Sequence, residues 1–269
     1  MRRDYSLPEF ERMSLVMAII MLAYASARFV EIPSQTINLD FAGLFLSLRV
    51  NLNTITSVMV ALLAAAGTDW ILHDGRNELA DRLQHWMIPA LTAWILSLPL
   101  ANLPLSVDWW LIFSGGAVLL SFVLIAEYIS QRNEHRYYSI ASVGLLALSY
   151  ALFLMLGINL EALEIRLVLI LPTLFAAAAL ISLRVQMLSQ EGKWSLVPIV
   201  GLAFLTTQIG AALHYWPLSP LSFAFLLLGV MYSLNNLLSA LKKEKLARQV
   251  LIENGLILLV FVILALLLP

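Results

Sequence analysis

The sequence predicts an all-α membrane protein. We expect a bundle of about nine transmembrane helices, with the N-terminus in the cytoplasm, the C-terminus outside, and a small extracytoplasmic β-hairpin between the first two helices. Three observations predict this fold class: a strongly apolar composition, nine separate apolar stretches and an alternating placement of basic residues. The chain is 61% hydrophobic and 12% charged, with a mean hydropathy of +0.88. These values leave too few polar residues to cover a water-soluble surface.

Each apolar stretch is close to the roughly 20 residues that a helix needs to cross a bilayer. Tryptophan and tyrosine flank many of the stretches, as is typical of side chains at the membrane–water boundary. The nine stretches are 13–30, 55–72, 86–105, 109–128, 137–156, 167–183, 194–215, 218–241 and 250–268. We therefore treat residues 1–269 as a single polytopic membrane domain.

The basic residues predict the direction of the chain through the membrane. Thirteen of the sixteen Lys and Arg residues lie in alternate segments, which are 1–12, 73–85, 129–136, 184–193 and 242–249. The other segments contain only Arg28, Arg49 and Arg166. Because Lys and Arg in short loops mark the cytoplasmic side, the N-terminus is expected inside and the C-terminus outside. The sequence therefore predicts a multi-pass protein of the cell (plasma or inner) membrane.

Residues 36–53 differ from the helical stretches in their period. Apolar residues alternate with polar ones both before and after Ala42-Gly43. A period of two is typical of a strand, and two such runs across a glycine-containing turn predict a hairpin. A lone hairpin has unpaired edges and cannot span lipid, so we expect it on the outer ends of the helices. The alternative is an irregular or re-entrant loop.

A polar cluster is predicted at the cytoplasmic edge. Asp69 and His73 are four residues apart on one helix face, and Glu127 ends another span on the same side. Neighbouring helix ends and loops add further polar side chains, namely Trp70, Asp74, His85, Tyr128 and His135. Such a set could bind a cation or exchange protons. The alternative, which the position of these charges at helix ends favours, is that each serves as an anchor at the membrane boundary.

Uncharged polar groups lie nearer the predicted midplane. Gln208 is near the middle of the seventh stretch, and Asn235 lies in the eighth. A polar cavity built from both would favour transport, with Gly115-Gly116 providing a gap. At this depth, however, amides and hydroxyls more often join helices by hydrogen bonds.

An outer polar set could clamp an anionic ligand, or its members could pair with one another. The set comprises Arg28, Glu31, Asp40, Arg49, Glu161, Glu164, Arg166, His214 and Tyr215. Inside, Lys242, Lys243, Lys245 and Arg248 form the densest basic cluster. This cluster could attract anionic headgroups of the bilayer or set the topology alone. The net charge of −1 gives no reason to expect nucleic acid as a partner.

Motifs of the common enzyme classes are absent. The sequence has no P-loop, no His-Glu-x-x-His, no Gly-x-Ser-x-Gly and no glycine-rich dinucleotide turn. It also has no cysteine, which excludes disulfides and thiolate metal sites. We therefore expect no enzyme activity, no catalytic or cofactor-binding residues, no metal and no cofactor.

Three sequence features carry a resemblance to a known family. They are His-Trp-Met-Ile-Pro-Ala-Leu-Thr-Ala at 85–93, Ala-Glu-Tyr at 126–128 and Tyr-Trp-Pro-Leu-Ser-Pro-Leu at 215–221. Together they resemble an uncharacterised family of bacterial polytopic membrane proteins, known only as a domain of unknown function. The resemblance implies the architecture and a bacterial cell membrane, and it implies no activity.

Three functional interpretations follow, and the third of them is a membrane enzyme or sensor. The first is a non-enzymatic integral membrane protein, either a component of a membrane complex or a membrane-organising factor. Sparse ionisable groups and short loops favour it. The alternative is a transporter or channel for a small or lipophilic solute. A polar cavity reaching Gln208 and Asn235 would favour the alternative, whereas a dry, packed interior would favour the first.

Overall fold

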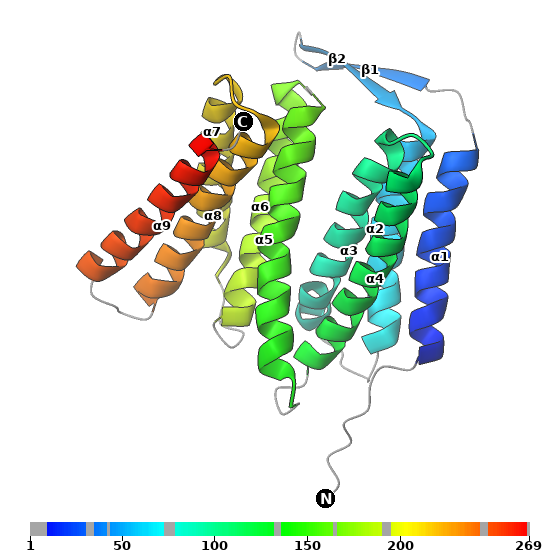
Figure 1. The fold of residues 1–269 in the computed structure, drawn as a ribbon, viewed down its shortest axis with the longest axis horizontal. Coiled ribbons are helices and arrows are strands. Elements are labelled where there is room, and N and C mark those ends of the chain that lie inside the picture. Colours follow the sequence, from blue (N-terminus) through cyan, green and yellow to red (C-terminus); the bar gives the residue numbers. More distant parts are fainter. Residues whose placement is uncertain are drawn as a thin grey trace, which may run out of the picture. The chain divides into compact units, whose positions relative to one another are not determined.

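The computed structural model describes residues 10–30, 35–41, 44–72, 79–131, 136–163, 166–189, 195–242 and 247–267. This part of the chain forms nine α-helices and two β-strands (Figure 1). It divides into two compact units, Met1–Ala141 and Ser142–Pro269. The sequence predicts one membrane domain, and the structure distinguishes these two units within it.

The first unit contains four helices that lie side by side (Figure 1). They are α1 (Phe10–Phe29), α2 (Leu52–Leu72), α3 (Leu79–Asn102) and α4 (Val107–Ser130). The buried residues of α1, among them Val16, Ile20 and Tyr24, recur at helical spacing. This stripe is the face that packs into the unit. Helix α3 packs against α1, α2 and α4. None of its residues from His85 to Ala101 is exposed, so it is the most enclosed helix of this bundle.

Side-chain hydrogen bonds join the helices of the first unit. The Tyr24 hydroxyl of α1 donates to the backbone carbonyl of Ala93 in α3 at 2.5 Å. The Ser97 hydroxyl of α3 lies 2.7 Å from the Ser57 hydroxyl of α2. Polar groups inside a membrane bundle need such partners because lipid supplies none.

The two strands lie between α1 and α2 in the sequence. They are β1 (Gln35–Phe41) and β2 (Leu44–Val50). They pair antiparallel, with Gln35 opposite Val50. The expected turn at residues 42–43 lies outside the described residues, and Leu52 already belongs to α2. An extracytoplasmic position for this segment stays a prediction.

The second unit contains the remaining helices. They are α5 (Tyr138–Ala162), α6 (Leu167–Ser189), α7 (Leu196–His214), α8 (Pro220–Lys242) and α9 (Ala247–Leu267). The first turn of α5 belongs to the first unit, which ends at Ala141. Helix α8 contacts α6, α7 and α9. At Gly229 in α8, an added Cβ atom would lie 2.6 Å from the Cβ atom of Phe261 in α9. Glycine therefore permits the close approach of α8 and α9.

Eight helices of the described chain are long and apolar enough to cross a membrane. The protein is therefore a multi-pass helical membrane protein. Helix α3 does not reach the same apolarity. Eight of the nine predicted spans therefore correspond to helices that are apolar enough to cross a membrane, and the ninth, at α3, stays a prediction. The end predicted for the sixth span was also wrong, because α6 extends beyond residue 183 to Ser189. Arg184 and Gln186 continue the helix and are buried in the unit.

Candidate functional site

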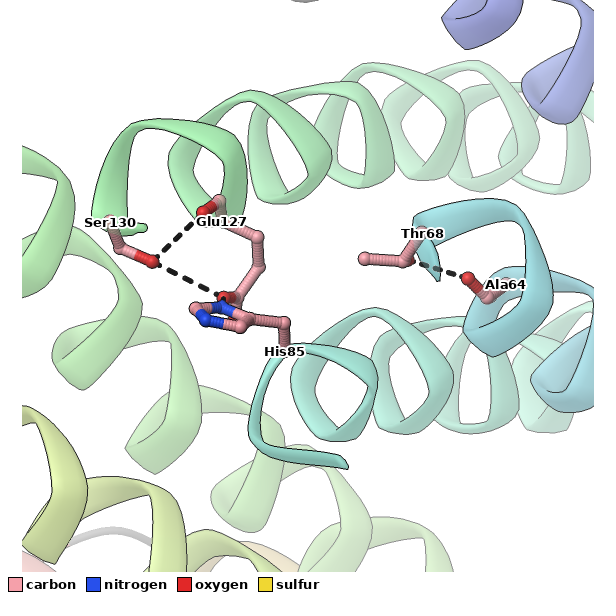
Figure 2. A network of polar contacts seen from close by, with 5 residues as sticks. All are labelled: Ala64, Thr68, His85, Glu127 and Ser130. Atoms are coloured by element: carbon pink, nitrogen blue, oxygen red, sulfur yellow. Dashed lines mark hydrogen bonds and ion pairs between the residues drawn. The ribbon is translucent and has the colours of Figure 1, made fainter. Parts of the chain in front are cut away.

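His85 and Glu127 form a buried polar pair in the first unit. His85 lies near the start of α3 and Glu127 near the end of α4. The imidazole Nδ1 atom is 2.9 Å from the carboxyl Oε2 atom, and Figure 2 shows the two side chains meeting between the helices. Their side chains are 8% and 0% exposed, respectively. The pair is therefore shielded from water.

Ser130 and Thr68 lie near this pair, on α4 and α2 (Figure 2). The Ser130 hydroxyl is 2.9 Å from the backbone carbonyl of Glu127 and 3.3 Å from its Oε2 atom. Thr68 donates to the carbonyl of Ala64 at 2.6 Å. The threonine hydroxyl is thus satisfied within its own helix, and Ser130 is the hydroxyl that reaches the carboxyl group.

The chemistry of the pair follows from its two groups. An ionised carboxylate only accepts hydrogen bonds, so with Glu127 ionised the imidazole of His85 donates from Nδ1. A hydrogen bond between two groups excluded from water is electrostatically stronger than one in water. The arrangement can hold a proton between α3 and α4, and it can also fix the packing of these two helices.

The predicted cytoplasmic cluster is only partly described. Asp69 is partly buried near the end of α2. The ring of its neighbour Trp70 lies 5.6 Å from the Arg12 guanidinium of α1. His73 lies outside the described residues. The structure therefore brings Glu127 together with His85, and the Asp69–His73 pair stays a prediction.

The second unit has a polar layer between α6 and α8. The Asn235 side-chain amide lies 3.2 Å from the Ser182 hydroxyl and 3.0 Å from the carbonyl of Met231. The side-chain amide nitrogen of Gln186 lies 3.3 Å from the backbone carbonyl oxygen of Asn235 and 3.2 Å from the Ser239 hydroxyl. Asn235 is 1% exposed and Gln186 is fully buried. These groups hold α6 against α8.

Gln208 and Asn235 differ in their surroundings. Gln208 lies on the exposed face of α7, next to the exposed Phe204 and Leu205. Asn235 is enclosed by its hydrogen bonds to α6 and α8. The second unit therefore does not bring these two amides into a common cavity. Asn235 instead joins helices, which is the other role that the sequence allowed.

The outer set contains one close pair among the described residues. The Nδ1 atom of His214, at the end of α7, is 3.0 Å from the Oε2 atom of Glu161, near the end of α5. Their side chains are 21% and 14% exposed. In the basic cluster, Arg248 is exposed. Lys243 and Lys245 lie outside the described residues, so an association with headgroups stays a prediction.

Sequence reasoning missed the polar partners on α6. Ser182 and Gln186 are four residues apart, as are Asn235 and Ser239 on α8. This matched spacing places each pair on one helix face, and it is the signal that would have found the layer. The signal was hidden because residues after 183 were assigned to a connector. A further contact, 2.9 Å between the amides of Asn236 and Asn254, joins α8 to α9.

Comparison with known proteins identifies a family and nothing closer. No curated protein and no solved structure matches the chain. A family model described as a protein of unknown function (DUF5656) matches residues 32–268. The match covers both strands and α2 to α9, and α1 precedes it. As the sequence resemblance indicated, the chain belongs to an uncharacterised family, the DUF5656 family of proteins of unknown function.

Proposed function

We propose that this chain is a non-enzymatic protein of the cell (plasma or inner) membrane, acting as a component of a membrane complex or as a membrane-organising factor. One observation carries the proposal: buried amide and hydroxyl groups of α6 and α8 form hydrogen bonds across these two helices. Asn235, Gln186 and Ser182 do so in the second unit. Groups used in this way hold a bundle together and do not line a path for solute.

The topology of the proposal has nine crossings, with the N-terminus inside and the C-terminus outside. Helix α3, with 24 residues, is about 36 Å long at 1.5 Å per residue, enough for a bilayer core of about 30 Å. Because α1, α2 and α4 pack around it, α3 can cross with fewer apolar residues than a lipid-facing helix. The crossing of α3 keeps the Arg- and Lys-rich connectors on one side and puts β1 and β2 on the other.

Accessibility of Ser182 tests the non-enzymatic, non-transporting proposal. The chain has no cysteine, so Ser182→Cys introduces a single, nearly isosteric thiol next to Asn235. We expect no reaction with a membrane-impermeant thiol reagent from either side of the membrane. Ser195→Cys, at an exposed position just before α7, is the matched control and should react. A reactive thiol at position 182 would mean that water reaches the polar layer, and the scaffold proposal would fail.

Assembly is tested separately. We expect the chain, extracted from its native membrane in a mild detergent, to migrate on a native gel as a defined species larger than the monomer. The same species should contain a constant set of components after cross-linking in the intact membrane. A chain that migrates as a lone monomer before and after cross-linking would contradict a role in a complex.

The alternative function is a transporter or channel for a small or lipophilic solute. The His85–Glu127 pair favours it, because ionisable groups within spans often mark proton or ion pathways. Reconstitution into vesicles with an internal pH-sensitive dye tests this alternative. A proton flux that is lost in Glu127→Gln would support transport. Equal dye responses from the wild type, the variant and empty vesicles would leave the pair with a structural role.

A further inference from the structure

A small polar pocket lies among the ends of α1, α2 and α3 in the first unit. Its volume is about 20 Å³, which is room for about one water molecule or one phosphate oxygen. Its polar lining residues are Tyr24, Arg28, Asn53, Thr56, Ser57 and Ser97, and Ala101 also lines it. The lining contains no carboxylate, so the pocket does not suit a cation.

Arg28 is the charged group of this pocket, and it lacks a partner among the described residues. Its side chain is partly buried and its Nε atom forms no hydrogen bond. Two other arginines have aromatic contacts: Arg12 over Trp70 at 5.6 Å and Arg136 over Tyr137 at 5.8 Å. A guanidinium withdrawn from water without a counter-charge is unfavourable. An anion bound here would supply the counter-charge that the described residues do not provide.

Three of the four hydroxyl groups that line the pocket already have acceptors. Tyr24 donates to the Ala93 carbonyl, Ser57 to the Asn53 carbonyl at 2.8 Å, and Ser97 contacts Ser57 at 2.7 Å. The Asn53 side chain forms no such bond among the described residues. Asn53 is also in the first turn of α2, where the helix dipole favours negative charge. Among the described residues, the donors left for a ligand are therefore those of Arg28, Asn53 and the Thr56 hydroxyl.

The position of the pocket along the helices selects the ligand class. Arg28 is in the last turn of α1, Asn53 in the first turn of α2 and Ala101 in the last turn of α3. Helix ends of a membrane bundle lie at the level of the lipid headgroups. We propose that this pocket binds a phosphate group, from an anionic lipid headgroup or from free phosphate, through the guanidinium fork of Arg28. This proposal rests on α1, α2 and α3 crossing the membrane, and not on which side the pocket faces.

Native mass spectrometry of the purified full chain tests the site. The chain in detergent is titrated either with dioleoylphosphatidylglycerol or with sodium phosphate, and bound molecules are counted. We expect one phosphate-bearing molecule to bind to the wild type, and Arg28→Gln to weaken its binding about tenfold or more. Arg166→Gln, at an exposed arginine before α6, is the control for loss of one positive charge and should bind as the wild type does.

A second variant separates the pocket from general charge attraction. Ala101→Leu keeps Arg28 and fills the pocket, so it should weaken binding as strongly as Arg28→Gln. Binding of the lipid alone assigns a headgroup site, and competition between lipid and phosphate assigns a site open to water. If Ala101→Leu binds like the wild type, the proposal is overturned, whether or not Arg28→Gln folds. Phosphate binding that depends on Arg28 in a chain whose α1 and α2 do not cross the membrane would overturn the proposed topology instead.

Discussion

The Nδ1 atom of His85 lies 2.9 Å from the Oε2 atom of Glu127, and this contact joins the start of α3 to the end of α4. The two residues are 42 positions apart in the sequence, and both side chains are shielded from water. Breaking a buried contact of this kind costs more free energy of unfolding than breaking an exposed pair.

Removal of the imidazole should destabilise the first unit. His85→Ala leaves the buried Glu127 carboxyl group without this hydrogen bond, and we expect a loss of about 3 kcal/mol or more in the free energy of unfolding. Glu127→Gln keeps a group that can bond to the imidazole, so its loss should be smaller. Unfolding in mixed micelles measures both. Ser114→Ala, at an exposed hydroxyl that bonds to its own helix, should change little.

The contribution of the pair itself requires a double-mutant cycle. We expect His85→Ala and Glu127→Ala together to cost clearly less than the sum of the single changes, because each single change already breaks the contact. Additive losses would show that the two side chains act independently and that the contact contributes nothing.

The approach of α8 to α9 depends on Gly229. An added Cβ atom at this position would collide with Phe261, so Gly229→Ala should destabilise the second unit by about 1–3 kcal/mol. Unfolding of the variant and of the wild type in mixed micelles would measure this loss. Gly144→Ala in α5, where an added Cβ atom meets nothing within 4 Å, is the control. Equal effects at Gly229 and Gly144 would contradict close packing here.

The two amides of the second unit should respond differently to the same change. Asn235→Leu breaks the bond to Ser182, and we expect a loss of about 1–2 kcal/mol in the free energy of unfolding. Gln208→Leu replaces an exposed amide on α7 and should leave the stability unchanged within about 0.5 kcal/mol. A larger loss for Gln208→Leu than for Asn235→Leu would reverse the assigned surroundings of these residues.

Much of the helical architecture could be predicted from the sequence, because a span needs an apolar stretch of a set length and connectors break it with charge. This reasoning located the helices that became α1, α2 and α4 to within a few residues. It failed at the end of α6, because Arg184 and Gln186 are polar and yet buried. A polarity pattern cannot distinguish a connector from a polar helix face that meets another polar face.

The candidate site was predictable only in part. The sequence showed that Glu127 lies at a helix end near other polar residues, and His85 was among the neighbours considered. It could not show that these two residues are partners, because their contact depends on how α3 and α4 pack. The sequence likewise could not show that Arg28 has no partner among the described residues, since pairing within the outer set depends on positions in space.

We propose nine membrane crossings, and the most direct test of this number concerns α3. Gly75→Cys precedes α3 and Ser106→Cys follows it, each in a chain without other cysteines. A membrane-impermeant maleimide applied to intact cells should label the thiol of the Ser106→Cys variant, whereas the thiol of the Gly75→Cys variant should react only after the membrane is permeabilised. Labelling of both thiols from the same side would contradict the claim, because α3 would then not cross and the connectors that follow would exchange sides.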